Sequence, residues 1–369
     1  MLAAPSHPRS GSLVLTGAGG FLGWHVRVLA RALGLDDPVV VSREDMRDAD
    51  RLAGLLSGSD RVLHVAGVNR GKPDTGNREL ADRLAEGLLR CATPPKAVVF
   101  ANSVQAGNGT PYGDGKAAAA GTLAEVTQWS GSRFTDIRLP HLFGEHGRPH
   151  YNSVVATFCR LLADGGTPRV DQDRELDLMH ATDAAALLLG VELPGAGPVR
   201  RSVGRLRDQL RDIARWYAAG EIPQLGSRFD VRLFNTYRSH HFPSGMPQKL
   251  RQLTDARGEL IEAVKVRGGG GQTFTSTTHP GVTRGQHFHL AKVERFLVLR
   301  GEAEIRVRRL LHEHVRSFRV SGESPAFVDM PSMWAHSITN VGQSELLTLF
   351  WSNEVFDPRR PDTYPEPVR

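Results

Sequence analysis

Four residues in the last third of the chain have the types and spacing of a metal-binding motif. His287, His289 and Glu294 form the pattern H-x-H-x4-E, and His336 follows further along the chain. Alternate residues of a strand point to the same face, so the first two histidines are expected to aim at one point. Three imidazoles and one carboxylate suit Zn²⁺, and also iron, manganese or nickel. The sequence therefore predicts a metal site, with a vestigial site of satisfied polar histidines as the alternative.

A glycine-rich stretch near the start of the chain has the pattern of a dinucleotide-binding turn. Gly17, Gly20 and Gly23 give G-x-x-G-x-x-G directly after an apolar segment, and Phe21 is expected to begin a helix. Glycines at these places let backbone amides approach a pyrophosphate at the helix N-terminus. The stretch therefore predicts a nicotinamide dinucleotide site.

Residues after the second and third expected strands bear on which dinucleotide is bound. Ser42 and Arg43 stand where an NAD enzyme usually carries an acidic residue for the ribose 2′-hydroxyl. Arg43 could instead pair with a 2′-phosphate, which predicts NADPH. The alternative is an exposed surface arginine, since acidic residues follow it directly. Ala66 and Gly67, after the third strand, are expected to border the cofactor.

Ser103, Tyr112 and Lys116 have the pattern of a reductase centre. The motif Y-x-x-x-K places Tyr112 and Lys116 on one helical face. Lys116 would lower the pKa of the tyrosine and hold the nicotinamide ribose, and Tyr112 would pass a proton to or from a substrate oxygen. Ser103 would hydrogen-bond that oxygen. The sequence therefore predicts catalysis by these three residues.

The segments around these motifs alternate between strand and helix patterns, which predicts an α/β Rossmann-type fold with a doubly wound parallel sheet. Strands are expected at 13–16, 39–41, 62–64, 97–100 and 134–139. Helices are expected at 21–33, 77–91, 116–129, 151–163, 181–192 and 206–219.

The pattern changes after about His241, where Pro243, Ser244, Gly245 and Pro247 mark a boundary. Short alternating strands follow at 296–299, 303–307, 326–328 and 346–351, which is typical of an all-β barrel. With the metal motif, this region predicts a cupin barrel. We expect two domains, an NADP-dependent reductase domain over 1–243 and a metal-binding cupin domain over 244–369.

Composition limits the classes of function. A length of 369 residues suits two domains, and the net charge of +6 suits an anionic substrate such as a dinucleotide or a nucleoside diphosphate. Basic runs interleaved with aromatic residues are absent, so nucleic-acid binding is not expected. Cys91 and Cys159 are expected in the core rather than in a disulfide, which fits a reducing cytoplasm. Neither a membrane-length apolar stretch nor a secretory signal over 1–10 is expected.

The N-terminal part resembles the extended short-chain dehydrogenase/reductases on the residues above. The whole chain resembles the bifunctional CapF/WbjC family of bacterial capsule and O-antigen synthesis, in which such a reductase is joined to a cupin. The strings that carry this resemblance, besides the metal motif, lie at 64–70, 103–106, 151–159, 255–258, 351–354 and 361–364.

The resemblance implies a cytoplasmic homodimer with two activities. The zinc-binding cupin would epimerise C3 of a UDP-linked 2-acetamido-2,6-dideoxy-4-hexulose, and the reductase would then reduce C4 with NADPH to a 6-deoxy-talose-type sugar. It places Asn152 and Ser153 near the nucleotide sugar, and Lys292 in the cupin substrate site. The chain departs from the family pattern at Leu290, where the family has a histidine, and at Ser332-Met333, where it has Pro-Gly.

Three other functions fit parts of this pattern. A single-activity ketoreductase could carry a cupin whose metal is only structural. A reductase could be fused to an iron-dependent cupin oxygenase. A metabolite-sensing regulator is a non-enzymatic possibility, which the intact serine, tyrosine and lysine argue against. The order of the two steps in the main hypothesis is fixed by chemistry, because reduction destroys the ketone that acidifies the C3 hydrogen.

Overall fold

The computed structural model describes residues 12–369, and the chain divides into two compact units, which are described separately. The first unit contains the chain up to Leu142 and the stretch Asp177–Arg200, and the second contains Phe143–Leu176 and Arg201–Arg369. Residues 1–10, where no secretory signal is expected, lie outside the described part. The compact units thus group residues 143–176 and 201–242 with the barrel. The predicted domain boundary at residue 243 stays a prediction.

The chain passes from one unit to the other within three strands. These are β6 (His141–Phe143), β7 (Glu175–His180) and β8 (Val199–Ser202).

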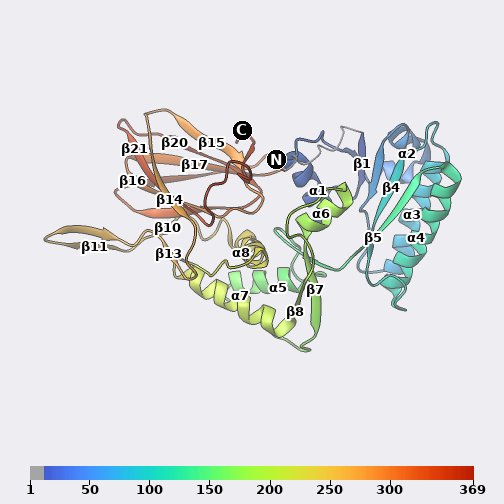
Figure 1. Cartoon of the computed structure of the whole chain (residues 1–369), viewed down its shortest axis with the longest axis horizontal. Helices are drawn as coiled ribbons and strands as arrows, with labels where there is room; N and C mark the ends of the chain where they lie inside the picture. Colours follow the sequence, from blue (N-terminus) through green and yellow to red (C-terminus); the bar gives the residue numbers. More distant parts are fainter. Residues whose placement is uncertain (1–11) are drawn as a thin grey trace. The chain divides into compact units, whose positions relative to one another are not determined.

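The first unit is built on a five-stranded parallel sheet with the order β2-β1-β3-β4-β5; Figure 1 labels β1, β4 and β5 of this sheet. The strand order reverses beside β1, which is the arrangement of a doubly wound sheet. The strands are β1 (Leu13–Thr16), β2 (Val39–Val41), β3 (Arg61–His64), β4 (Ala97–Ser103) and β5 (Arg133–Leu139). The helices are α1 (Phe21–Ala32), η1 (Asp45–Arg47), α2 (Ala49–Leu56), α3 (Pro73–Leu89), α4 (Pro111–Ser130) and α6 (Ala181–Leu189).

Strand β4 lies in the middle of this core. All of its residues are buried, as expected of a parallel strand covered on both faces. Helix α4 begins at Pro111, earlier than the predicted start at residue 116, because the Thr110 hydroxyl accepts the Gly113 amide and caps the helix. The earlier start places Tyr112 inside the first turn of the helix.

The second unit contains helices α5 (Val154–Ala163), α7 (Val203–Ala218) and α8 (Arg228–His241). Helix α8 is not among the predicted helices. The Ser227 hydroxyl accepts the Asp230 amide at 3.2 Å and caps it, and Phe229, Leu233 and Phe234 are buried along it. Its sequence therefore has both a start signal and apolar residues at helical spacing.

Two five-stranded antiparallel sheets form most of the rest of this unit, with the orders β10-β19-β16-β21-β14 and β18-β17-β20-β15-β22, and two small sheets pair β11 with β12 and β13 with β9. They confirm the predicted all-β region and are consistent with a cupin barrel. The strands are β9 (Glu221–Ile222), β10 (Gln248–Lys249), β11 (Gln252–Asp255), β12 (Gly258–Ile261), β13 (Lys265–Val266), β14 (Gln272–Thr278), β15 (Thr283–Phe288), β16 (Glu294–Arg300), β17 (Glu302–Arg309), β18 (Val315–Ser321), β19 (Ala326–Met330), β20 (Trp334–Asn340), β21 (Leu346–Ser352) and β22 (Tyr364–Pro365).

A buried arginine joins the barrel to the chain that precedes it. Arg295 of β16 and Asp329 of β19 are in contact at 2.7 Å with both side chains fully buried, and Arg295 also donates to the Gly220 carbonyl. The Arg295 guanidinium lies over the Phe327 ring. Among residues 12–369, no helix is long and apolar enough to cross a membrane.

Two candidate active centres

The glycine turn between β1 and α1 is packed so closely that two of its glycines cannot be replaced without strain. Gly17 has φ +71°, and a Cβ on it would lie 2.6 Å from the Ala66 amide nitrogen. A Cβ on Gly23 would lie 2.2 Å from the Gly17 carbonyl oxygen. Gly20 is the N-cap residue of α1 and has no side chain that could bond the first amides of the helix. The structure thus brings Ala66 against a turn that fits a pyrophosphate.

Thr16 connects this turn to the segment after β3. Its hydroxyl accepts the amides of Val65 and Ala66 at 3.2 Å each and contacts His64 Nδ1 at 2.9 Å. Burial, and then the charge of Lys116, lower the pKa of His64 to about 3, so His64 is a neutral packed residue. Sequence reasoning did not single out Thr16, since a threonine at the end of a strand carries no motif.

The loop after β2 is closed by Asp45. Its carboxylate accepts the Ser42 amide at 2.7 Å and pairs with Arg51, while its own amide donates to the Ser42 hydroxyl. Hydrogen bonds from Ser42 hold the pKa of Asp45 below its usual value. This carboxylate is therefore engaged within its own loop. The Arg43 side chain is exposed. Exposure is compatible with both alternatives, a contact with a 2′-phosphate and a surface arginine, and does not distinguish them.

The three predicted catalytic residues lie together at the end of β4 and the start of α4. Ser103 ends β4 and is close enough to Tyr112 to oppose the effect of burial on the pKa of its hydroxyl. Lys116 Nζ donates to the Ala101 carbonyl of the same strand at 2.9 Å. A Cβ on Gly67 would lie 3.4 Å from Lys116 Nζ, so the segment predicted to border the cofactor adjoins the lysine.

Burial sets the protonation of this centre. It raises the pKa of Tyr112, and Ser103 offsets only part of that shift. Burial also lowers the pKa of Lys116 to about 8, against an opposing effect of Asp136. Tyr112 is therefore protonated at neutral pH and can donate a proton to a substrate oxygen.

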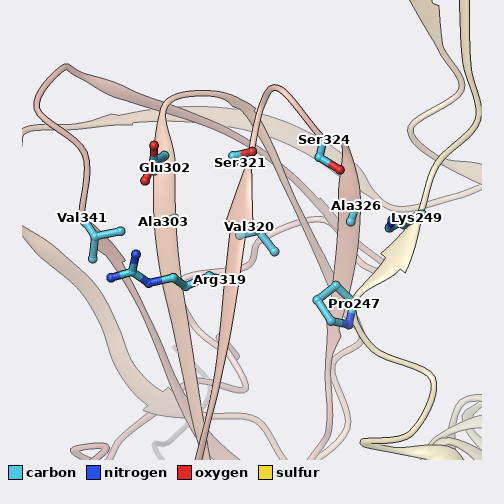
Figure 2. Close-up of a pocket in the computed structure, with 10 residues that line it drawn as sticks. All are labelled: Pro247, Lys249, Glu302, Ala303, Arg319, Val320, Ser321, Ser324, Ala326 and Val341. Carbon is cyan, nitrogen blue, oxygen red and sulfur yellow. The ribbon is translucent and has the colours of Figure 1, made fainter.

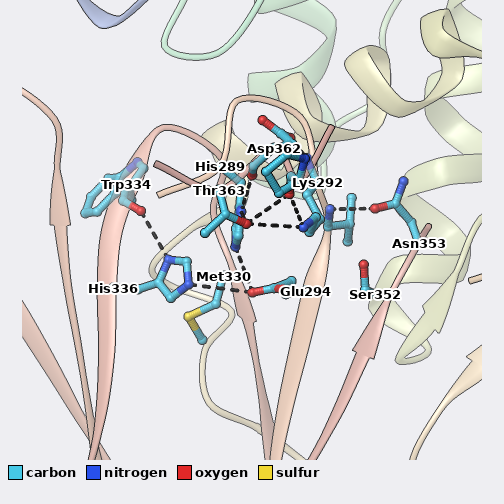
Figure 3. Close-up of polar contacts among 12 residues, drawn as sticks. His289, Lys292, Glu294, Met330, Trp334, His336, Ser352, Asn353, Asp362 and Thr363 are labelled. Atoms are coloured by element: carbon cyan, nitrogen blue, oxygen red, sulfur yellow. Dashed lines mark hydrogen bonds and ion pairs between the residues drawn. The ribbon is translucent and has the colours of Figure 1, made fainter. Parts of the chain in front are cut away.

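The predicted metal ligands form one cluster in the barrel, and Figure 3 shows three of them, His289, Glu294 and His336. One ligand atom from each of His287, His289, Glu294 and His336 lies within 4.8 Å of the others. His287 and His336 are paired across β15 and β20, and Glu294 begins β16. Glu294 Oε2 lies 2.8 Å from His289 Nε2 and 3.6 Å from His336 Nε2.

The donor set fits a divalent metal. His336 Nε2 is buried and has no hydrogen-bond partner among the described residues. The other ring nitrogens of His289 and His336 face the carbonyls of Asp362, at 2.6 Å, and Trp334, at 3.3 Å, as is usual for metal-bound histidines. Burial and the neighbouring imidazoles lower the pKa of His287 to about 3. Burial raises the pKa of Glu294, but the His289 and His336 imidazoles outweigh it and hold that pKa well below its usual value.

The C-terminal segment holds the turn that carries Lys292. The Asp362 carboxylate accepts the amides of Leu290, Ala291 and Lys292 at 2.9, 2.8 and 2.7 Å. Lys292 Nζ donates to the Pro361 carbonyl at 2.5 Å. Lys292 thus lies near the cluster but is held by the protein itself. Asp362 falls in the string 361–364 that carries the family resemblance, although its role was not predicted.

The remaining predicted substrate residues and the family departures have structural partners. The Ser153 hydroxyl caps α5 by accepting the Ala156 amide at 3.3 Å, and Asn152 beside it is exposed. The Ser332 hydroxyl donates to the carboxylate of Glu145 at 2.9 Å, and both side chains are buried. Leu290 is buried, and its carbonyl accepts Arg232 Nη1.

A hollow of about 360 Å³ lies elsewhere on the barrel and shares no residue with the cluster (Figure 2). Its polar residues carry both signs of charge, so it does not indicate one class of ligand. The lining residues are Pro247, Lys249, Glu302, Ala303, Arg319, Val320, Ser321, Ser324, Ala326 and Val341.

Comparisons with known proteins agree with the fold. Residues 13–193 match the NAD dependent epimerase/dehydratase family, and residues 253–364 match the polysaccharide biosynthesis C-terminal domain. The chain is thus an NAD(P)-dependent enzyme of the oxidoreductase and epimerase class, with a C-terminal domain of polysaccharide biosynthesis.

Full-length relatives define the family more closely. The chain is 32% identical over 366 residues to a UDP-2-acetamido-2,6-beta-L-arabino-hexul-4-ose reductase of Pseudomonas aeruginosa, covering 95% of this chain and 97% of that protein. It is similar to the capsular polysaccharide assembling protein CapF of Staphylococcus aureus, with 29% identity, a TM-score of 0.59 and coverage of 97% and 100%. A structure of CapF with the inhibitor 3-isopropenyl-tropolone gives 28% identity, a TM-score of 0.54 and the same coverage. The chain therefore belongs to the CapF/WbjC family of nucleotide-sugar epimerases and reductases.

Proposed function

We propose that this chain is an enzyme with two reaction centres that act in sequence on one nucleotide sugar. The barrel centre epimerises C3 of a UDP-2-acetamido-2,6-dideoxy-4-hexulose, and the reductase centre then reduces its C4 ketone with NADPH. The product is a 6-deoxy-talose-type UDP-sugar for capsule, O-antigen or a related glycan. The observation that carries this proposal is that one chain assembles both a serine, tyrosine and lysine set and a cluster of three histidines and a glutamate. The name of the Pseudomonas aeruginosa relative supports the reductase half.

In the reduction step, bound NADPH would supply the hydride for C4. Tyr112 gives its hydroxyl proton to the C4 oxygen, which its raised pKa allows because the phenol is protonated at neutral pH. Ser103 hydrogen-bonds the same oxygen and orients the ketone. Lys116, fixed against β4 and next to Gly67, holds the nicotinamide ribose.

In the epimerisation step, a divalent metal, for which we propose zinc over iron, manganese or nickel, would polarise the C4 ketone and acidify the C3 hydrogen. His287, His289, Glu294 and His336 would hold it. Metal binds neutral imidazoles and ionised carboxylates, which the lowered pKa values of His287, His336 and Glu294 favour. Burial opposes a charge on His289, but Glu294 outweighs burial and raises the pKa of His289, so metal would displace a proton there. Lys292 lies beside them, where its charge favours an anionic substrate.

The test crosses two variants with two measurements, using the 4-keto sugar, NADPH and deuterated water. Tyr112→Phe should stop NADPH oxidation and leave deuterium incorporation at C3 intact. His336→Ala should lower metal content and C3 exchange, and should still reduce a ketone whose C3 is already inverted. If Tyr112→Phe reduces the ketone at near the unmutated rate, the reductase assignment is wrong.

The same experiment separates the alternatives. Full C3 exchange by metal-free protein would make the metal structural and would favour a single-activity reductase. Oxygen consumption that depends on iron would favour a cupin oxygenase. If metal removal abolished reduction both of the 4-keto sugar and of the ketone whose C3 is already inverted, the two centres would not be independent.

We also propose that the chain works as a cytoplasmic homodimer, with a reductase domain over 1–243 and a cupin domain over 244–369. The β11–β12 hairpin supports association, because Leu253 and Leu260 are paired across it and are 45% and 57% exposed. Sedimentation of the full chain should give twice the monomer mass of 40.4 kDa. A monomer at micromolar concentration would contradict the dimer.

A further inference from the structure

Helix α8 contacts the two loops that carry or precede metal ligands. The first ligand loop, residues 289–293, joins β15 to β16, and the second ligand loop, residues 331–333, joins β19 to β20. On the first loop, Asn235 Nδ2 donates to the Ala291 carbonyl at 2.6 Å. At the start of the second, Arg238 Nη1 donates to the Met330 carbonyl at 3.0 Å. One helix therefore holds the backbone on both sides of the cluster.

These two side chains are also bonded to each other. Asn235 Oδ1 accepts Arg238 Nη2 at 2.7 Å, so a continuous path of hydrogen bonds runs from the Ala291 carbonyl through Asn235 and Arg238 to the Met330 carbonyl. We call this path the α8 relay. Asn235 is 1% exposed and Arg238 3% exposed. Buried polar groups that lose a partner cannot turn to water instead, so the relay has one favourable arrangement.

The α8 relay contacts chain segments that are close in sequence to the metal ligands. His289 opens the first ligand loop, and its carbonyl accepts the Met333 amide of the second loop at 2.7 Å. His336 follows the second loop in β20. The separation of these two histidines thus depends on how far apart the two loops are held. Metal–ligand distances tolerate deviations of only about 0.2 Å, so the spacing of the loops bears on metal affinity.

We propose that Asn235 and Arg238 are positioning residues of the metal centre. The α8 relay fixes the spacing between the two ligand loops, and with it the affinity and geometry of the metal site. Because α8 precedes the barrel strands in sequence, the metal site of the barrel depends on a helix outside the barrel. This inference rests on the metal-binding half of the proposed function.

The test uses the full-length protein with Co²⁺ as the probe. Asn235→Leu is close in volume and removes both bonds of the side chain, whereas Asn235→Asp keeps the acceptor for Arg238 and loses the donor for Ala291. Thr236→Val is the matched control, because Thr236 is fully buried on the same helix and its hydroxyl bonds to the Arg232 carbonyl within α8. Metal affinity is measured by competition with a chelator, geometry by the visible Co²⁺ absorption bands, and stability by Tm.

Both Asn235 variants should bind Co²⁺ about tenfold more weakly and show altered absorption bands, as for other outer partners of metal ligands. Thr236→Val should bind like the unmutated protein, even where its Tm falls as much. Equal affinity and spectra for the Asn235 variants and Thr236→Val would overturn the inference and leave the relay a fold element only. If Asn235→Leu does not fold, Asn235→Asp decides. An unmutated chain that fails to bind Co²⁺ would overturn the metal half of the proposed function, which is a different result.

Discussion

The glycine turn allows a sharp test, because one of its glycines is closely surrounded by backbone atoms and another, two residues later, has open space around it. Gly17 has φ +71°, and a Cβ on it would meet backbone atoms of Val65 and Ala66 at 2.6 to 2.9 Å. Gly19 has an ordinary φ, and a Cβ on it would meet nothing within 4 Å. Gly17→Ala should therefore damage the turn, and Gly19→Ala should leave it intact.

The size of the effect follows from two costs. Placing an L-residue in the left-handed region costs about 1–2 kcal/mol. Forcing a methyl group into closely packed surroundings costs about 1–3 kcal/mol, and here the neighbours are backbone atoms that cannot rotate away. The free energy of unfolding should fall by about 2–5 kcal/mol for Gly17→Ala and by less than about 0.5 kcal/mol for Gly19→Ala.

Chemical denaturation gives the stabilities, and fluorescence titration with NADPH gives the binding. Gly17→Ala should lose dinucleotide affinity together with stability, because the methyl group separates the turn from the segment at Ala66. Gly19→Ala serves as the control for the loss of a glycine in the same turn. If the two variants differ by less than about 0.5 kcal/mol, the close approach of the two segments is not as described.

Three further outcomes are expected. Burial lowers the pKa of Lys116 to about 8 from 10.5, so unfolding takes up a proton between these pH values. The stability of the cofactor-free protein, relative to that of Lys116→Met, should therefore rise as the pH increases from about 8 to 10.5. A difference in denaturation midpoints that does not change with pH would contradict this. Arg43→Ala should weaken NADPH binding by about 1.5–3 kcal/mol and hardly change NADH binding in titrations, and equal weakening of both would argue against a 2′-phosphate contact. Arg295→Met leaves Asp329 buried without its cation and should lower the free energy of unfolding by about 3–5 kcal/mol. The double variant Arg295→Met, Asp329→Leu should regain most of that stability.

The fold class could be predicted because it depends on local patterns. Strands β1 and β2 have the predicted bounds, since a short run of apolar residues between turns leaves little choice. Helix α4 begins five residues earlier than predicted, because the periodic part of its sequence starts only after its cap at Thr110. Helix α8 was missed, although Ser227 caps it and apolar residues follow at helical spacing. Its many polar residues, which are buried in the structure, hid that pattern.

The sequence by itself determined which residues could do chemistry, because each motif is a matter of residue type and short spacing. Tyr112 and Lys116 share a helical face, and His287 and His289 are close in sequence, whatever the rest of the chain does. Only the tertiary structure brought His336 to Glu294, Asp362 to the turn at Lys292, and Asn235 to Ala291, which is 56 residues away. Such contacts join segments that are distant in sequence and leave no periodic trace in either of them, so what surrounds the metal ligands is decided by packing.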